Sequence, residues 1–208
     1  MGYEIKITGE SRSFPVGDAF LDGSVSGAGI VLHLGTPLER SEAKTAILVE
    51  LDCECLGVHT GEDSGREGSN ILGFARYCNG NDAPSQLIEL VRQPETEKTA
   101  IDAAKTMFEA AGFTVVVCAD QVGRIVDRLV RPKYNDALRF LDEGLALADD
   151  MDLICTMGLG YRDGPIERAV RGGLARHYDL SDALLQATGQ SGYVPARRAA
   201  IAKARETS

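Results

Sequence analysis

The hydrophobic period of this chain changes near residue 120, and that change sets the fold class. Before it, short apolar runs rich in Val, Ile and Leu are separated by segments containing Gly, Pro and Asp. After it, apolar residues recur at three and four positions, beginning with Val122, Ile125, Val126, Leu129 and Val130. Short bounded runs are typical of strands, and the longer spacing is typical of amphipathic helices. The sequence therefore predicts a small α/β domain followed by an all-α domain.

Six short apolar runs and one helical segment account for the chain up to residue 118. The predicted strands are Tyr3–Thr8, Gly29–Leu34, Thr45–Leu51, Asn70–Ala75, Gln86–Val91 and Phe113–Cys118. Thr96–Ala111 has the apolar spacing of a helix, and Gly112 marks its end. A helix followed by a buried strand is the unit of an α/β sheet. The polar, glycine-rich loop Gly61–Asn70 is expected to stay unpacked.

The second half is predicted to be all-helical. A long helix begins near residue 121 and contains Pro132, which we expect to bend it or to remove one backbone hydrogen bond. Further helices are predicted near Asp149, after Gly164-Pro165, over Leu180–Thr188 and over Pro195–Lys203. The domains are therefore placed at residues 1–118 and 121–208.

The charge of the chain is concentrated in its first half. Residues 1–118 hold 9 Lys+Arg and 18 Asp+Glu, whereas residues 119–208 hold 13 of each, so the formal net charge is −9. An acidic chain without a basic stripe gains little from neutralising phosphates, so nucleic acid is not an expected partner. No apolar run approaches the ~20 residues of a membrane span, and Met1–Glu10 alternates. We therefore expect a soluble, cytoplasmic protein without a membrane partner.

The cysteines do not form a recognisable metal motif. They are Cys53, Cys55, Cys78, Cys118 and Cys155, and the Cys-Asp-Cys spacing of the first two lacks the paired pattern of a zinc site. Free cysteine is among the most buried residue types. Structural core thiols are therefore the favoured interpretation, and no metal is predicted.

One long segment carries a family resemblance. It is DQVGRIVDRLVRPKYNDALRFLDEGLALADDMDLICTMGLGYRDGP, Asp120 to Pro165. From about residue 70 to its end, the chain resembles the 3-hydroxyacyl-CoA dehydrogenase family, and this segment is similar to the start of the family's C-terminal helical domain. The resemblance implies that this domain supplies a dimer interface and one wall of an acyl-CoA cleft. The preceding part is similar to the reduced Rossmann-like domain in the second half of long members, including those of aromatic-acid (phenylacetate) degradation.

The resemblance also implies catalytic positions. The family uses a His–Glu dyad, and Glu89 in Leu87-Ile88-Glu89-Leu90 matches the glutamate. Counting back from Glu89 by the family's spacing, the position of the histidine is occupied by Tyr77. A tyrosine, whose pKa is near ~10, is a poor base at neutral pH. Glu89 and Tyr77 are therefore candidate catalytic residues of a degenerate dyad. The alternative for Glu89 is a solvent-facing strand residue.

Three further residues lie at positions of interest in the resemblance. Asp127 occupies the position of a family asparagine in the first C-terminal helix and is a candidate catalytic residue; its alternative is an ion pair with Arg128 or Arg124. Asn79 and Arg124 are candidate substrate-binding residues. An aspartate keeps the acceptor oxygen of asparagine but loses the amide donor, and its charge would repel an enolate.

The family cofactor is NAD, which the resemblance alone implies here. A dinucleotide motif needs glycines between a strand and a helix, so that the pyrophosphate meets the helix N-terminus. The nearest pattern, Gly27-Ala28-Gly29-Ile30-Val31-Leu32, ends in leucine and continues into an apolar run that is itself a predicted strand. The sequence therefore predicts that this chain's own NAD site is degenerate.

Two functions remain open. In the first, the chain is an oxidoreductase of acyl-CoA β-oxidation, fatty-acid metabolism or phenylacetate degradation. It is then a dehydrogenase of the 3-hydroxybutyryl-CoA type or a component of one. In the second, the chain is a non-catalytic module. In the second case it binds an acyl-CoA or completes a dimer. The expected partners are an acyl-CoA and either a second copy of the chain or a full-length dehydrogenase.

Overall fold

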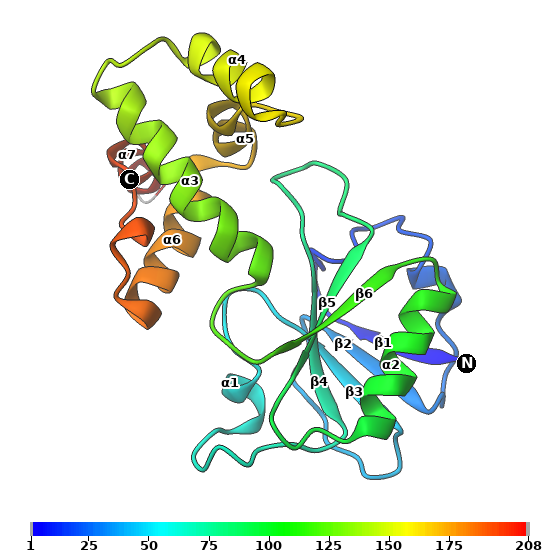
Figure 1. Cartoon of the computed structure of the whole chain (residues 1–208). Helices are drawn as coiled ribbons and strands as arrows, with labels where there is room; N and C mark the ends of the chain where they lie inside the picture. Colours follow the sequence, from blue (N-terminus) through cyan, green and yellow to red (C-terminus); the bar gives the residue numbers. More distant parts are fainter. Residues whose placement is uncertain (1, 207–208) are drawn as a thin grey trace. The chain divides into compact units, whose positions relative to one another are not determined.

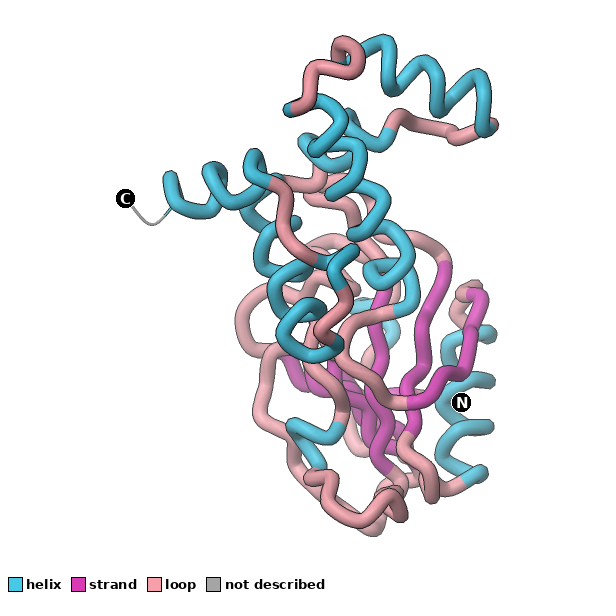
Figure 2. Tube along the Cα trace, turned by 60° about the vertical axis from the view of Figure 1, so that its left-hand side comes forward, coloured by secondary structure: helices cyan, strands magenta, loops and turns pink. Residues whose placement is uncertain are grey.

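The computed structural model describes residues 2–206, which form two compact units. The first unit contains the chain up to Cys78 and then Pro84–Gln121. The second contains the chain from Val122 onward together with the short internal segment Asn79–Ala83. Every described strand belongs to the first unit, and the second consists of helices and loops (Figure 1, Figure 2). The predicted fold class, α/β plus all-α, is confirmed.

The first unit is built on a six-stranded sheet whose strands follow chain order from one edge to the other. They are β1 (Tyr3–Ile7), β2 (Ile30–Leu34), β3 (Ala46–Glu50), β4 (Ile71–Arg76), β5 (Leu87–Arg92) and β6 (Thr114–Ala119). Neighbouring strands are parallel, except that β4 and β5 are antiparallel. All six predicted strands are present, because each is a short apolar run bounded by turn-forming residues.

Few helices connect these strands. Among the described residues, the links between β1 and β4 contain only the short helices η1 (Leu21–Gly23) and α1 (Gly57–Thr60), which the apolar pattern does not predict. The long helix α2 (Lys98–Ala110) joins β5 to the parallel strand β6 and lies along the sheet in Figure 1. Its apolar spacing places Met107 and Phe108 in the main core of this unit.

Both faces of the central strands are buried. In β2, Ile30, Leu32 and Leu34 belong to the cluster that includes α2, whereas Val31 belongs to a second cluster. Successive side chains of a strand point to opposite faces, so these clusters cover the two sides of the sheet. Parallel strands buried on both sides are near-continuous apolar runs in sequence, which is the pattern seen here.

The second unit contains five α-helices within the described residues. They are α3 (Ile125–Asp142), α4 (Ala148–Leu159), α5 (Pro165–Arg171), α6 (Leu174–Thr188) and α7 (Arg197–Glu206), with the short helix η2 (Ser191–Tyr193) before α7. Pro132 lies inside α3 as predicted. Helix α6 begins six residues before the predicted start, because its first turns contain Arg176 and His177, which are not apolar. None of the helices in residues 2–206 combines the length and apolarity needed to cross a membrane.

The internal segment Asn79–Ala83 packs within the second unit, at the C-terminal end of α5. Asn79 Nδ2 donates a hydrogen bond to the Arg168 carbonyl oxygen at 3.2 Å, and Asp82 pairs with Arg171 at 3.1 Å. Gly80 has a φ of +61°, and a Cβ there would lie 2.4 Å from the Arg171 carbonyl oxygen. Glycine is therefore required at this close approach.

The expectation of buried core thiols is wrong, whereas the expectation of an unpacked loop holds over 61–66, where every residue is exposed. All five cysteines are half-buried, and none is a fully buried core thiol. The loop after α1 is also organised, because the Glu67 carboxylate accepts hydrogen bonds from the backbone N–H groups of Ser64, Asp63 and Gly65. The bonds from Ser64 and then Asp63 are the main causes that lower the pKa of Glu67 to about 2. A polar composition alone does not reveal that one carboxylate can order such a loop.

Candidate functional site

Glu89 is a buried carboxylate in the middle of β5. It is 4% exposed, and the β4–β5 register pairs it with Ala75. The alternative that Glu89 is a solvent-facing strand residue is therefore wrong. An ionisable side chain is rarely buried without a polar partner, so this burial distinguishes Glu89 from an ordinary surface glutamate.

Tyr77 directly follows β4, and Arg76 is the last residue of that strand. Ala75 and Glu89 are paired and share one face of the sheet, whereas Tyr77 lies beyond the last residue of β4. Arg76 is on the other side, where its guanidinium pairs with Asp18 at 2.6 Å and lies 4.7 Å from the centre of the Phe113 ring. Arg76 is therefore committed elsewhere and is not a cationic partner for Tyr77.

Asp127 lies in the first turn of α3 and forms an ion pair with Arg131. Its Oδ1 accepts hydrogen bonds from Nε of Arg131 at 3.0 Å and from Nη2 of the same side chain. Both side chains are largely buried, at 14% exposed for Asp127 and 6% for Arg131. The alternative interpretation, in which Asp127 forms an ion pair, is therefore correct. The partner is Arg131, one helical turn farther along α3, and not Arg124 or Arg128. Arg128 instead donates from Nε to the Val122 carbonyl oxygen.

A buried polar network extends from this pair into α6. Arg131 Nη1 lies 3.3 Å from His177 Nδ1, and His177 Nε2 lies 2.9 Å from Asn135 Oδ1. Asn135 Oδ1 also accepts from the Ala196 N–H, so it is an acceptor toward His177 and fixes the proton on Nε2. Burial and then the charge of Arg131 lower the pKa of His177 to about 3. The sequence analysis missed this network, although the spacing of Asp127 and Arg131 by four residues is a detectable signal.

The two candidate substrate-binding residues are buried in the second unit. Arg124 is 5% exposed and precedes α3, where Gly123 has a φ of +75° and packs against Leu184. Asn79 is 4% exposed and is bound to the end of α5 as described above. The second unit therefore holds Asn79, Arg124 and Asp127, whereas Glu89 and Tyr77 belong to the first. Their roles stay predictions.

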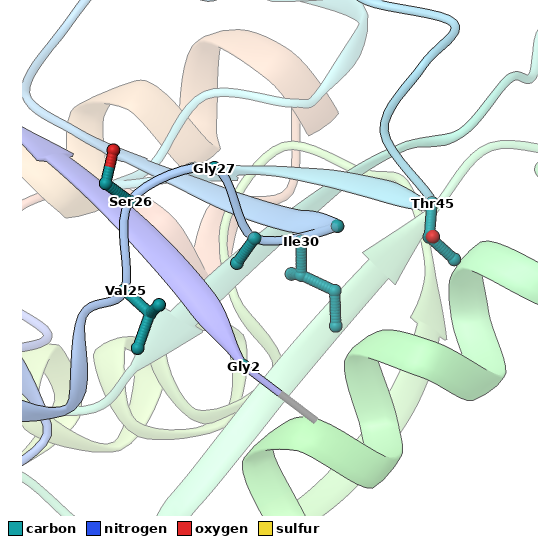
Figure 3. A pocket seen from close by; sticks show the side chains of 8 residues that line it. Gly2, Val25, Ser26, Gly27, Ile30 and Thr45 are labelled. Atoms are coloured by element: carbon teal, nitrogen blue, oxygen red, sulfur yellow. The ribbon is translucent and has the colours of Figure 1, made fainter.

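The glycine pattern lines a pocket of about 330 Å³ in the first unit. Figure 3 shows Val25, Ser26 and Gly27 on the loop that leads into Ile30, and Gly2 and Thr45 lie just before β1 and β3. The pocket is therefore at the amino ends of three parallel strands. Ligands of open α/β sheets bind outside the carboxyl ends of the strands, and a pyrophosphate needs a helix N-terminus after the glycines. These residues do not fit NAD binding in the family manner.

Cys55, Glu62 and Asp120 bring their ligand atoms within 4.8 Å of one another in the first unit. The two carboxylate oxygens of Asp120 accept hydrogen bonds from the backbone N–H groups of Leu56 and Gly57, at 2.7 and 2.8 Å. Asp120 thereby fixes the chain where α1 begins. These two hydrogen bonds from backbone N–H groups are sufficient to explain why the Asp120 side chain lies at this position.

Sequence comparison identifies the second unit. Residues 123–205 match the family model described as the 3-hydroxyacyl-CoA dehydrogenase C-terminal domain. A probable 3-hydroxyacyl-CoA dehydrogenase of Caenorhabditis elegans is 37% identical over 82 residues, which are 39% of this chain and 26% of the relative. The mitochondrial hydroxyacyl-coenzyme A dehydrogenase of Homo sapiens is 33% identical over the same shares. The match thus spans about a quarter of the length of these relatives.

Other comparisons cover both units. The 3-hydroxybutyryl-CoA dehydrogenase of Bradyrhizobium diazoefficiens is 29% identical over 79% of this chain and 59% of its own length. The crystal structure of (S)-3-hydroxybutyryl-CoA dehydrogenase from Ralstonia eutropha superimposes with a TM-score of 0.70 at 20% identity, covering 86% of this chain and 66% of that one. The structural likeness shows that the fold is shared. Residues 123–205 are thus similar to the C-terminal domain of the 3-hydroxyacyl-CoA dehydrogenase family.

Proposed function

We propose that this chain is an acyl-CoA-binding, dimer-forming member of the family that does not bind NAD in the family manner. The observation that carries the proposal is the position of Gly27 and Gly29, directly before β2 and not between a strand and a helix. The Asp127–Arg131 ion pair supports it, because a carboxylate held by its neighbour on the helix does not replace the amide of an asparagine.

The proposed ligand class comes from the relatives, which are 3-hydroxyacyl-CoA and 3-hydroxybutyryl-CoA dehydrogenases. In this proposal the helical unit contributes one wall of an acyl-CoA site. The chain then acts in β-oxidation or in aromatic-acid (phenylacetate) breakdown, either holding an acyl-CoA or completing a full-length dehydrogenase. The hydride chemistry belongs to that partner, so no reaction step through NAD is assigned to this chain.

Calorimetry and NADH oxidation with acetoacetyl-CoA test the proposal. The purified chain should bind acetoacetyl-CoA saturably, give no saturable NADH binding, and show no turnover even at high protein concentration. A full-length 3-hydroxyacyl-CoA dehydrogenase in the same assay is the positive control. Saturable NADH oxidation by the chain alone would contradict the proposal.

The burial of Glu89 favours a second candidate, an active dehydrogenase with an altered proton-transfer group. In that case Glu89 orients or stabilises the group that exchanges a proton with the substrate hydroxyl, and Tyr77 is the candidate for that group. Glu89→Gln keeps the size of the side chain and removes its charge. Any turnover of the wild-type chain should then fall by roughly 100-fold. Unchanged turnover, with an unchanged unfolding midpoint, would remove Glu89 from the reaction.

The dimer part of the proposal rests on α4. In this helix only Met151 is buried, whereas Leu153, Ile154 and Met157 are 58%, 63% and 80% exposed. Contiguous exposed apolar side chains of this kind are typical of interfaces. We expect the wild-type chain to sediment as a dimer and Ile154→Lys to sediment as a monomer with an unchanged circular dichroism spectrum. Val16→Lys, at a 94% exposed site in the first unit, is the matched control and should remain dimeric. A monomeric wild type contradicts the prediction.

A further inference from the structure

No further inference is drawn: the strongest candidate, the cluster of Cys55, Glu62 and Asp120 beside α1 in the first unit, carries nothing, because it consists of one cysteine and two carboxylates, both oxygens of Asp120 already accept backbone N–H groups, and nothing else within residues 2–206 points to a ligand bound there.

Discussion

Replacing Asp127 by alanine should lower the free energy of unfolding by about 3–5 kcal/mol, because it removes the counter-ion of a buried guanidinium. The Arg131 side chain is 6% exposed, and Asp127 is the carboxylate that pairs with it. Without that carboxylate, the positive charge would remain beside His177 in the interior of the helical unit. Equilibrium unfolding in urea measures the loss as a lower midpoint with an unchanged slope.

Asp136→Ala provides the matched control on the same helix. Asp136 pairs with Arg139, but its side chain is 57% exposed, so we expect a change below about 1 kcal/mol. Asp127→Asn keeps an acceptor oxygen and should cost less than Asp127→Ala. Equal, small losses for Asp127→Ala and Asp136→Ala would contradict the structural role and return Asp127 to the candidate catalytic residues.

The helical unit should lose about 4 kcal/mol of its free energy of unfolding between pH 6.5 and pH 3 through His177 alone. Burial and the charge of Arg131 lower the pKa of His177 from 6.5 to about 3. Above pH 6.5 the histidine is neutral in both states. Below pH 6.5, the unfolded chain binds a proton that the folded chain does not. The unfolded state is therefore stabilised relative to the folded state as the pH falls.

Unfolding midpoints measured across this pH range test the assignment. His177→Gln retains a donor that can reach Asn135 Oδ1 and has no titratable group, so its stability should fall less steeply below pH 6.5. The dependence of stability on pH that remains in this variant comes from other titratable groups. These include His33, whose pKa is also lowered by burial. Identical slopes for the two proteins would show that His177 does not carry the acid dependence.

Much of the fold could be predicted because most of its helices and strands have an unambiguous hydrophobic period in the sequence. Strands such as β2 and β3 are short apolar runs in which both faces are buried, and α2 and α3 each place an apolar stripe against a core. The start of α6 was harder, because His177 in its first turns is polar but buried, with hydrogen-bond contacts to Arg131 and Asn135. Hydrophobic spacing cannot detect a helix face that is buried through hydrogen bonds.

The site was less predictable for a similar reason. The family resemblance located Glu89 and Asp127, but the burial of Glu89 depends on packing that one sequence does not specify. The partner of Asp127 could have been found from the four-residue spacing to Arg131. By contrast, the bond from Asn79 to Arg168 joins residues 89 positions apart, and no local pattern indicates it.

The Asn79–Ala83 segment also decides where the chain can be cut. These residues belong to the helical unit but lie between β4 and β5, so the covalent chain passes between the units three times. A fragment starting at Val122 would lack the groups that bind Arg168 and Arg171. A fragment ending at Gln121 would carry an insert without its binding surface. Neither half is therefore a transferable module, and a chimaera with a related dehydrogenase must exchange this insert together with the helices.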